Sequence, residues 1–140
     1  MGADIVYGEI GHKMTQPGFE TGYWQGPVVL EGIPFESDMF RHEFYGPIFC
    51  LYRVNSGQEA IEYANNSDHG KSATVFSESP LYCKTIALNL RVGSVHINRA
   101  VYSSTEFPAG GIKNSGSGSS SYSDGLLNLS NRKSIVNKCW

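Results

Sequence analysis

The sequence predicts an α/β fold built on parallel strands, and two observations carry that prediction. Between residues 48 and 98, three apolar segments of strand length alternate with two segments of helical spacing. Short joints separate them, which is typical of parallel β-α-β units. Right-handed crossovers would place both helices on one face of a single sheet. Sites in such sheets lie at the carboxyl ends of the strands.

The N-terminal third of the chain is predicted to contain two extended segments and long connections. A short strand covers residues 3–8, and a second extended segment lies within 23–30. Between them, residues 9–22 are rich in glycine and proline and are predicted to form a loop. Residues 31–40 form a connector with room for one helical turn around residues 37–39.

Local signals define the elements of the alternating region. Ser56 is placed to cap the first helix. Ser79-Pro80 starts the second helix, because a hydroxyl can cap it and proline suits the first turn. The predicted elements are a strand at 48–54, a helix at about 57–66, a strand at 72–76, a helix from Pro80 that stops at Gly93, and a strand at 94–98.

The C-terminal part does not continue this alternation of strands and helices. Residues 99–125 hold two glycine- and serine-rich stretches, and a long loop in a compact domain is usually functional or disordered. A short helical stretch is predicted near 122–129, and a terminal strand at 133–136. With nothing after it in this chain to pair with, that strand is expected to pair with another subunit or with a missing part.

Composition excludes several classes of protein. The 140 residues are 40% hydrophobic and 17% charged, which suits one globular domain. A net charge of −2 gives no broad basic field, so nucleic acid is not an expected partner. No apolar run approaches the roughly 20 residues of a membrane span. Three cysteines without CxxC spacing indicate reduced thiols, and we expect a cytoplasmic location.

Metal, thiol and phosphate-loop chemistry find little support in the sequence. The histidines at positions 12, 42, 69 and 96 lack metal-ligand spacing, so no metal site is predicted. Cys50 lies in an apolar strand and Cys83 on a helix, where both are typical of small core residues, and Cys139 is next to the end. A P-loop requires Lys and then Ser or Thr directly after its last glycine. In the segment 111–117, Ser117 follows that glycine and the lysine precedes it, so the pattern does not match.

The segment from Arg41 to Val54 contains the candidate cofactor site. The Gly46-Pro47 corner ends one segment and begins a strand, which leaves Glu43 and Tyr45 at the start of that strand. A carboxylate there can accept hydrogen bonds from both hydroxyls of a ribose, and an aromatic ring can lie against a flat ring. The other interpretation is a loop with an exposed glutamate and a core tyrosine, and these residues alone leave both open.

Four segments, taken together, resemble the C-terminal part of the aldehyde dehydrogenase superfamily. They are, in order, Glu43–Pro47, Glu59–Gly70, Val92–Asn98 and Pro108–Gly118. The resemblance covers nearly all of the chain, and it is closest to NAD(P)-dependent succinate-semialdehyde dehydrogenases. It implies an α/β fold with a parallel-sheet part of the catalytic domain over residues 1–125 and an oligomerisation strand within 126–140.

The resemblance also implies a mechanism and site residues. In the family, a cysteine thiolate adds to the aldehyde, hydride leaves to the nicotinamide, and water hydrolyses the thioester. The nucleophile, the general base and most of the dinucleotide-binding domain lie upstream, so no catalytic residue is expected in this chain, which alone should be inactive. NAD or NADP is the implied cofactor, a small aldehyde the substrate, and a homo-oligomer the assembly. Glu43 is expected to hold the nicotinamide-side ribose beside Tyr45, while Ser103, Ser104 and Phe107 belong to a wall of the aldehyde pocket.

Three departures from the family pattern favour an alternative. Lys71 stands where the family has Leu close to the nicotinamide, and a buried, unpaired charge there is costly. Ala109 replaces the Phe of a Pro-Phe-Gly-Gly motif, and residues 119–121 replace a segment that usually contains Arg-Glu. The alternative is a non-catalytic assembly or interaction module derived from the same fold.

Overall fold

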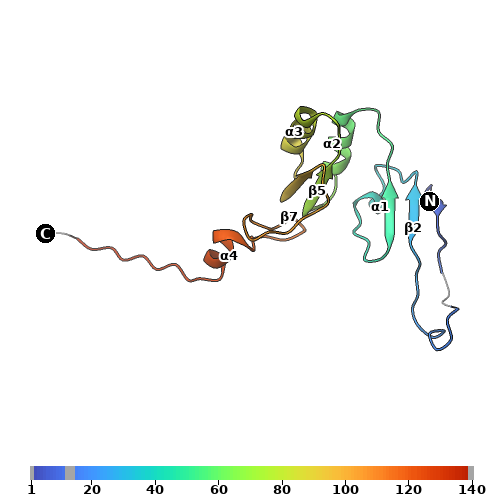
Figure 1. Cartoon of the computed structure of the whole chain (residues 1–140), viewed down its shortest axis with the longest axis horizontal. Coiled ribbons are helices and arrows are strands. Elements are labelled where there is room, and N and C mark those ends of the chain that lie inside the picture. Colours follow the sequence, from blue (N-terminus) through green and yellow to red (C-terminus); the bar gives the residue numbers. More distant parts are fainter. Residues whose placement is uncertain (1, 12–14, 139–140) are drawn as a thin grey trace. The chain divides into compact units, whose positions relative to one another are not determined.

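The computed structural model describes residues 2–11 and 15–138, and it divides the chain into two compact units, residues 1–67 and 68–140 (Figure 1). The first unit contains β1 (Asp4–Tyr7), β2 (Val28–Glu31), α1 (Asp38–Arg41), β3 (Ile48–Leu51) and α2 (Gly57–Asn65). The second contains β4 (His69–Gly70), β5 (Ser72–Val75), α3 (Pro80–Asn89), β6 (Ser94–Ile97), β7 (Ile112–Lys113) and α4 (Tyr122–Asn128).

A three-stranded sheet forms the centre of the first unit. Its order is β1-β2-β3, with β1 antiparallel to β2 and β2 parallel to β3. Val28, Leu30 and Ile33 are buried and form the core cluster. Burying such side chains contributes roughly 1.5–3 kcal/mol each. The middle strand therefore stabilises this unit and fixes the start of β3 beside it.

Helix α2 completes the first unit through its cap and its aromatic face. Ser56 Oγ accepts a hydrogen bond from the Glu59 amide at 3.1 Å, as the sequence predicts. The Tyr63 ring stacks on Phe35 with centroids 4.6 Å apart and meets the Phe40 ring edge-on at 5.7 Å. Phe40 also meets Tyr52, just after β3, at 4.8 Å. These rings pack the helix against the connector that precedes β3.

The second unit contains one β-α-β unit. Strands β5 and β6 pair in parallel, and α3 connects them and packs on both. Ser79 Oγ accepts from the Tyr82 amide at 3.3 Å, and Pro80 is the first helical residue. Cys83 on this helix is 0% exposed. The predicted strand at 72–76, helix start and strand at 94–98 are therefore confirmed within one residue.

One expectation about strand pairing is wrong. In the described part of the chain, β3 pairs with β2 and lies in a different sheet from β5 and β6. One continuous parallel sheet is therefore not formed, because the apolar pattern of a strand does not specify its neighbour. Residues 133–136 have no partner strand among the described residues, so their predicted pairing with another subunit or with a missing part stays a prediction.

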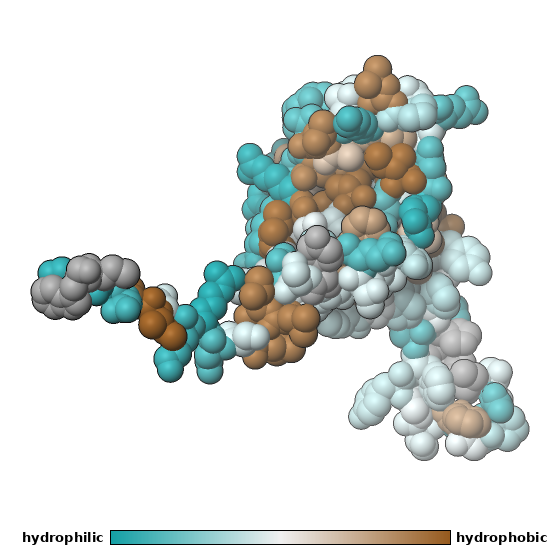
Figure 2. All heavy atoms as spheres, turned by 60° about the vertical axis from the view of Figure 1, so that its left-hand side comes forward, coloured by the Kyte–Doolittle hydropathy of each residue, from teal (hydrophilic) through white to brown (hydrophobic). Residues whose placement is uncertain are grey.

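Large apolar side chains remain at the surface of the described chain, including the stretch that leads to its C-terminus (Figure 2). Ile135 is 85% and Val136 95% exposed. No helix in the described ranges combines the length and the apolar character needed to cross a bilayer.

Candidate functional site

The predicted cofactor residues lie at the start of β3, in the first unit. Glu43 is exposed, and Tyr45 is 93% exposed. The interpretation of Tyr45 as a core residue is therefore wrong. Between them, the Phe44 ring meets the His42 ring edge-on at 5.5 Å. A carboxylate and a free aromatic face are thus presented two residues apart beside a strand end.

Pro47 sets the corner that positions this segment. The Ile48 amide donates to the Gly46 carbonyl at 2.8 Å, which closes a three-residue turn across Pro47. The Pro47 carbonyl in turn accepts from the Val28 amide at 2.9 Å, which ties the turn to β2. Gly46 is not among the residues with positive φ, and a Cβ there would meet nothing within 4 Å. The special backbone freedom of glycine is therefore not needed at this corner.

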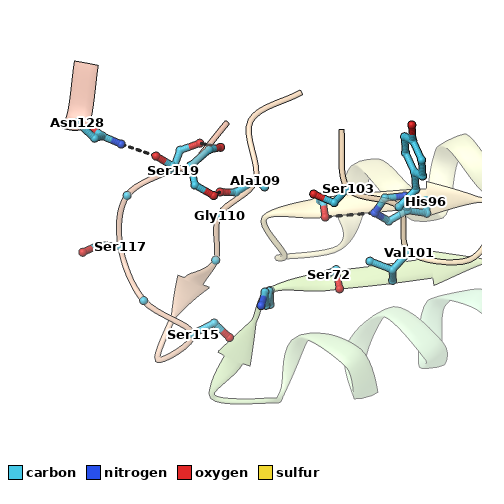
Figure 3. Close-up of a pocket in the computed structure, with 17 residues that line it drawn as sticks. Ser72, His96, Val101, Ser103, Ala109, Gly110, Ser115, Ser117, Ser119 and Asn128 are labelled. Atoms are coloured by element: carbon cyan, nitrogen blue, oxygen red, sulfur yellow. Dashed lines mark hydrogen bonds between the residues drawn. The ribbon is translucent and has the colours of Figure 1, made fainter. Parts of the chain in front are cut away.

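A cavity of about 730 Å³ lies within the second unit (Figure 3). Its wall combines the first residues of β5 and β6, the segment 101–103 and the glycine-rich segment 109–120. Seven serines line it, namely Ser72, Ser94, Ser103, Ser115, Ser117, Ser119 and Ser120. Lys71 and His96 also line it, but no aspartate or glutamate does. The wall therefore carries many hydroxyl groups and one permanent positive charge.

Close backbone packing holds the glycine-rich segment in place. A Cβ on Gly93 would lie 1.9 Å from the Gly110 carbonyl oxygen, and one on Gly110 would lie 2.4 Å from the Gly118 carbonyl oxygen. Ala109 and Ser120 exchange two backbone hydrogen bonds of 2.8 and 2.7 Å. Glycine is needed at positions 93 and 110 because the neighbouring backbone leaves no room for a side chain.

The predicted substrate residues line a second cavity of about 330 Å³ in the same unit. Ser103, Ser104 and Phe107 all contribute to its wall. The guanidinium of Arg99 lies 4.4 Å from the centre of the Tyr102 ring, in cation-π contact, on the same wall. Ser103 and Ala109 line both cavities, so the two hollows share a boundary there.

The described cysteines do not resemble nucleophiles. Cys83 is fully buried, and its sulfur lies 3.9 Å from the Ser77 carbonyl oxygen. Burial raises the pKa of the Cys50 thiol, although a hydrogen bond from Tyr52 opposes this. A reactive thiol needs the opposite shift. The prediction that these two are core residues fits their surroundings, and Cys139 lies outside the described residues.

His96 pairs with a hydroxyl group and does not belong to a metal-binding cluster of the described residues. Its Nε2 atom lies 3.5 Å from Ser94 Oγ, two residues earlier on the same face of β6 (Figure 3). No group of three or more His, Cys, Asp or Glu among the described residues is placed to hold a metal ion. His12 lies outside those residues.

The comparison with known families identifies this fold. The model of the aldehyde dehydrogenase family matches residues 1–135. This chain belongs to the aldehyde dehydrogenase family. The predicted α/β fold with parallel strands is thereby confirmed, as is the resemblance stated from the four sequence segments.

Similar proteins include curated relatives and solved structures. An aldehyde dehydrogenase of Paenarthrobacter nicotinovorans is 34% identical over 114 residues, covering 81% of this chain and 25% of the relative. A 3-succinoylsemialdehyde-pyridine dehydrogenase of a Pseudomonas species is 35% identical over 117 residues, covering 84% of this chain and 24% of the relative. The structure of succinic semialdehyde dehydrogenase from Streptococcus pyogenes with NADP⁺ superposes with a TM-score of 0.82 at 33% identity, covering 97% of this chain and 29% of that one.

The share of each relative that the chain matches limits which parts of such an enzyme the chain can contain. It spans about a quarter of the length of the curated relatives it matches. Within that length, Ser103, Ser104 and Phe107 line one cavity of the second unit, and Glu43 and Tyr45 are exposed near the start of β3 in the first. Their roles as substrate and cofactor ligands stay predictions.

Sequence reasoning missed several residues of the larger cavity. Ser72, Ser94 and Ser115 line it, yet none was a candidate. For Ser94 and His96 a signal was present, because a spacing of two on a strand places both side chains on one face. Ser115 has no such signal, since its hydroxyl reaches the Gly70 amide across 45 residues of sequence at 3.0 Å.

Proposed function

We propose that this chain is the C-terminal portion of an NAD(P)-dependent aldehyde dehydrogenase that oxidises a small aldehyde, with succinate semialdehyde a candidate, to the carboxylate. The match to the family over residues 1–135, at about a quarter of the relatives' length, carries the proposal. In this view residues 1–125 belong to the catalytic domain and 126–140 form the oligomerisation segment of a cytoplasmic enzyme.

The cofactor fits the chemistry of the residues at the start of β3. Glu43 offers a solvent-facing carboxylate that can accept hydrogen bonds from the two ribose hydroxyls, and the exposed ring of Tyr45 offers a flat contact. When bound, the nicotinamide cofactor supplies the hydride acceptor. The Pro47 turn is tied to β2 and fixes the backbone that follows both side chains, where β3 begins.

The residues that line the smaller cavity of the second unit are proposed to contact the substrate. Phe107 is expected to contact the carbon chain of the aldehyde, and the hydroxyls of Ser103 and Ser104 to donate to a carboxylate at its far end. Because Cys83 is buried and the pKa of Cys50 is raised, neither supplies a thiolate. The nucleophile and the general base are therefore proposed to come from polypeptide outside these 140 residues, and the isolated chain is proposed to be inactive.

Two measurements test this proposal. Calorimetry with NAD and NADP should detect binding that Glu43→Ala weakens about tenfold, because a charge-assisted hydrogen-bond acceptor is lost. Glu78→Ala, at another exposed glutamate, is the control and should leave binding unchanged. The second measurement follows NAD(P)H formation from succinate semialdehyde by the chain alone. Robust turnover that a single Cys→Ser change abolishes would contradict the proposal.

The family departures at Lys71, Ala109 and residues 119–121 support the alternative of a non-catalytic assembly module. The terminal segment exposes Ile135 and Val136 almost completely, which suits a strand that pairs with a second copy of the chain. Cofactor binding that Glu43→Ala weakens would favour the enzyme portion, whereas an absence of binding would leave both functions open. In both cases the chain is proposed to form a homo-oligomer through its last segment.

A further inference from the structure

The larger cavity of the second unit has a wall that suits an anionic, oxygen-rich molecule. It is lined by seven serines, by Lys71 and by His96, with no carboxylate side chain among the lining residues. Backbone of the glycine-rich segment forms much of the remaining surface. An acid-free wall with a permanent cation attracts negative charge, and the hydroxyls can both donate and accept hydrogen bonds.

Several of these groups have no partner within the part of the chain that the structure describes. The Lys71 ammonium makes no ion pair there, although it is the only permanent charge on the wall. The hydroxyls of Ser72, Ser103 and Ser117 make no hydrogen bond there either. Other wall hydroxyls are fixed by the fold, since Ser115 Oγ accepts from the Gly70 amide and Ser120 Oγ donates to the Ala109 carbonyl at 3.1 Å. Some wall hydroxyls are therefore held by hydrogen bonds within the fold, while the Lys71 ammonium and three serine hydroxyls are available to a ligand.

The three departures from the family pattern converge on this cavity. Lys71, Ala109 and the serines at 119 and 120 all line it. The first change adds a cation where Leu is usual, and the second removes an aromatic side chain, which enlarges the cavity. The third replaces an Arg-Glu segment, which has no net charge, by serines and so adds hydroxyls to the wall.

We propose that this cavity binds a hydroxylated carboxylate of sugar-acid size, with Lys71 as its counter-charge. A single lysine matches one carboxylate, and the free hydroxyls match the hydroxyls of such a chain. The volume of about 730 Å³ lies within the usual range of ligand sites and leaves much space around a four-carbon semialdehyde. The inference rests on the proposed function and deepens it: the substrate is a hydroxylated aldehyde, and its acid product reaches from Ser103, which both cavities share, to Lys71 in the larger one. Its binding is measured without any catalysis.

The test is a titration of the ¹⁵N-labelled 140-residue chain with gluconate at about 0.15 M ionic strength, where exposed charges are partly screened. The backbone amides of Gly110, Gly111, Gly116 and Gly118, which lie on the wall, should shift with ligand. Lys71→Leu should weaken binding about tenfold, since a charge-assisted hydrogen bond is lost. Lys71→Arg should keep most of the affinity. Lys84→Leu removes an exposed lysine that does not line the cavity, and it should change nothing.

Further titrations test which groups of the ligand are recognised and where on the protein it binds. Sorbitol, which lacks the charge, and hexanoate, which lacks the hydroxyls, should each bind at least about tenfold more weakly than gluconate. Ala109→Phe should reduce gluconate binding by filling the cavity, and Ala100→Phe, at an exposed position that does not line it, should not.

Three results would overturn the inference. They are unshifted wall glycines at saturating gluconate, equal losses in Lys71→Leu and Lys84→Leu, or inorganic phosphate binding as tightly as gluconate. Gluconate binding through Lys71 in a chain that binds neither NAD nor NADP would support this site while contradicting the proposed function.

Discussion

Replacing Gly93 by alanine tests whether the glycine-rich wall is held by close backbone packing. The new Cβ would lie 1.9 Å from the Gly110 carbonyl oxygen and 3.1 Å from the Lys71 carbonyl oxygen. Ordinary van der Waals contact begins at 3.4 Å, so the backbone of one of the two segments must retreat by about 1.5 Å. The Gly93 amide, which donates to the Gly70 carbonyl at 3.1 Å, and the Ser94 amide, which donates to the Lys71 carbonyl at 3.2 Å, lie at the same place.

The expected cost follows from these contacts. Overpacking of this kind costs about 1–3 kcal/mol, and each weakened hydrogen bond adds about 0.5–1.5 kcal/mol. Alanine restricts the unfolded chain and returns about 0.4–1 kcal/mol. The net loss for the second unit is about 3 kcal/mol, which corresponds to about a hundredfold rise in its opening equilibrium.

Amide hydrogen exchange measures this opening directly. The amides of Ser94 and Asn98, which donate to carbonyls of Lys71 and Val75, should exchange about a hundredfold faster in Gly93→Ala. Gly46→Ala is the matched control, because a Cβ at Gly46 meets nothing within 4 Å. Protection at Ser94 and Asn98 that stays within about threefold of the unchanged chain, or less than 1 kcal/mol, would refute the packing argument.

Three further predictions concern a cap, a phenol and the terminal segment. Ser56→Ala should lower the stability of the first unit by about 1 kcal/mol in urea unfolding, because the Glu59 amide loses its cap, and an unchanged midpoint would contradict this. Burial and the neighbouring Cys50 thiol raise the pKa of Tyr52 from 10.0 to about 12. The folded form therefore holds this proton more tightly, so stability is full below pH 10 and falls as the pH rises to 12, a decline that Tyr52→Phe should flatten in alkaline unfolding. Val136→Asp, at a 95% exposed position, should reduce self-association in sedimentation velocity, whereas Asn131→Asp should not.

Local signals were sufficient for most elements of the fold. A serine before an amphipathic run, or a serine-proline pair, satisfies exposed amides at a helix start whatever surrounds it, and both α2 and α3 begin where these residues predict. The short helix predicted near 122–129 is found as α4 at Tyr122–Asn128. Two-residue strands carry no periodicity, so β4 and β7, which pair across more than 40 residues of sequence, could not be foreseen.

The candidate site was only partly accessible from the sequence, for a related reason. Glu43 and Tyr45 were proposed because a Gly-Pro corner is a contiguous signal, and Ser103, Ser104 and Phe107 were proposed from resemblance. The larger cavity instead depends on tertiary approach, as in the bond between Ser115 Oγ and the Gly70 amide. A contact between residues far apart in sequence cannot be predicted from the spacing of neighbouring residues. The family departures at 71, 109 and 119–121 were visible in the sequence, but their common location was not.

The rings that join α2 to its connector have a spectroscopic consequence. Tyr52 and Tyr63 lie among Phe35 and Phe40 with centroids 4.6–6.2 Å apart, all within the first unit. Immobilised tyrosines in asymmetric surroundings give strong near-ultraviolet circular dichroism. Tyr82 and Tyr102 of the second unit contribute to the same band, so the part of the melting signal that Tyr63→Phe removes is the part that reports on residues 1–67. Exchange at Ser94 reports on the other half. The interval between the two transitions would measure how cooperatively the halves unfold.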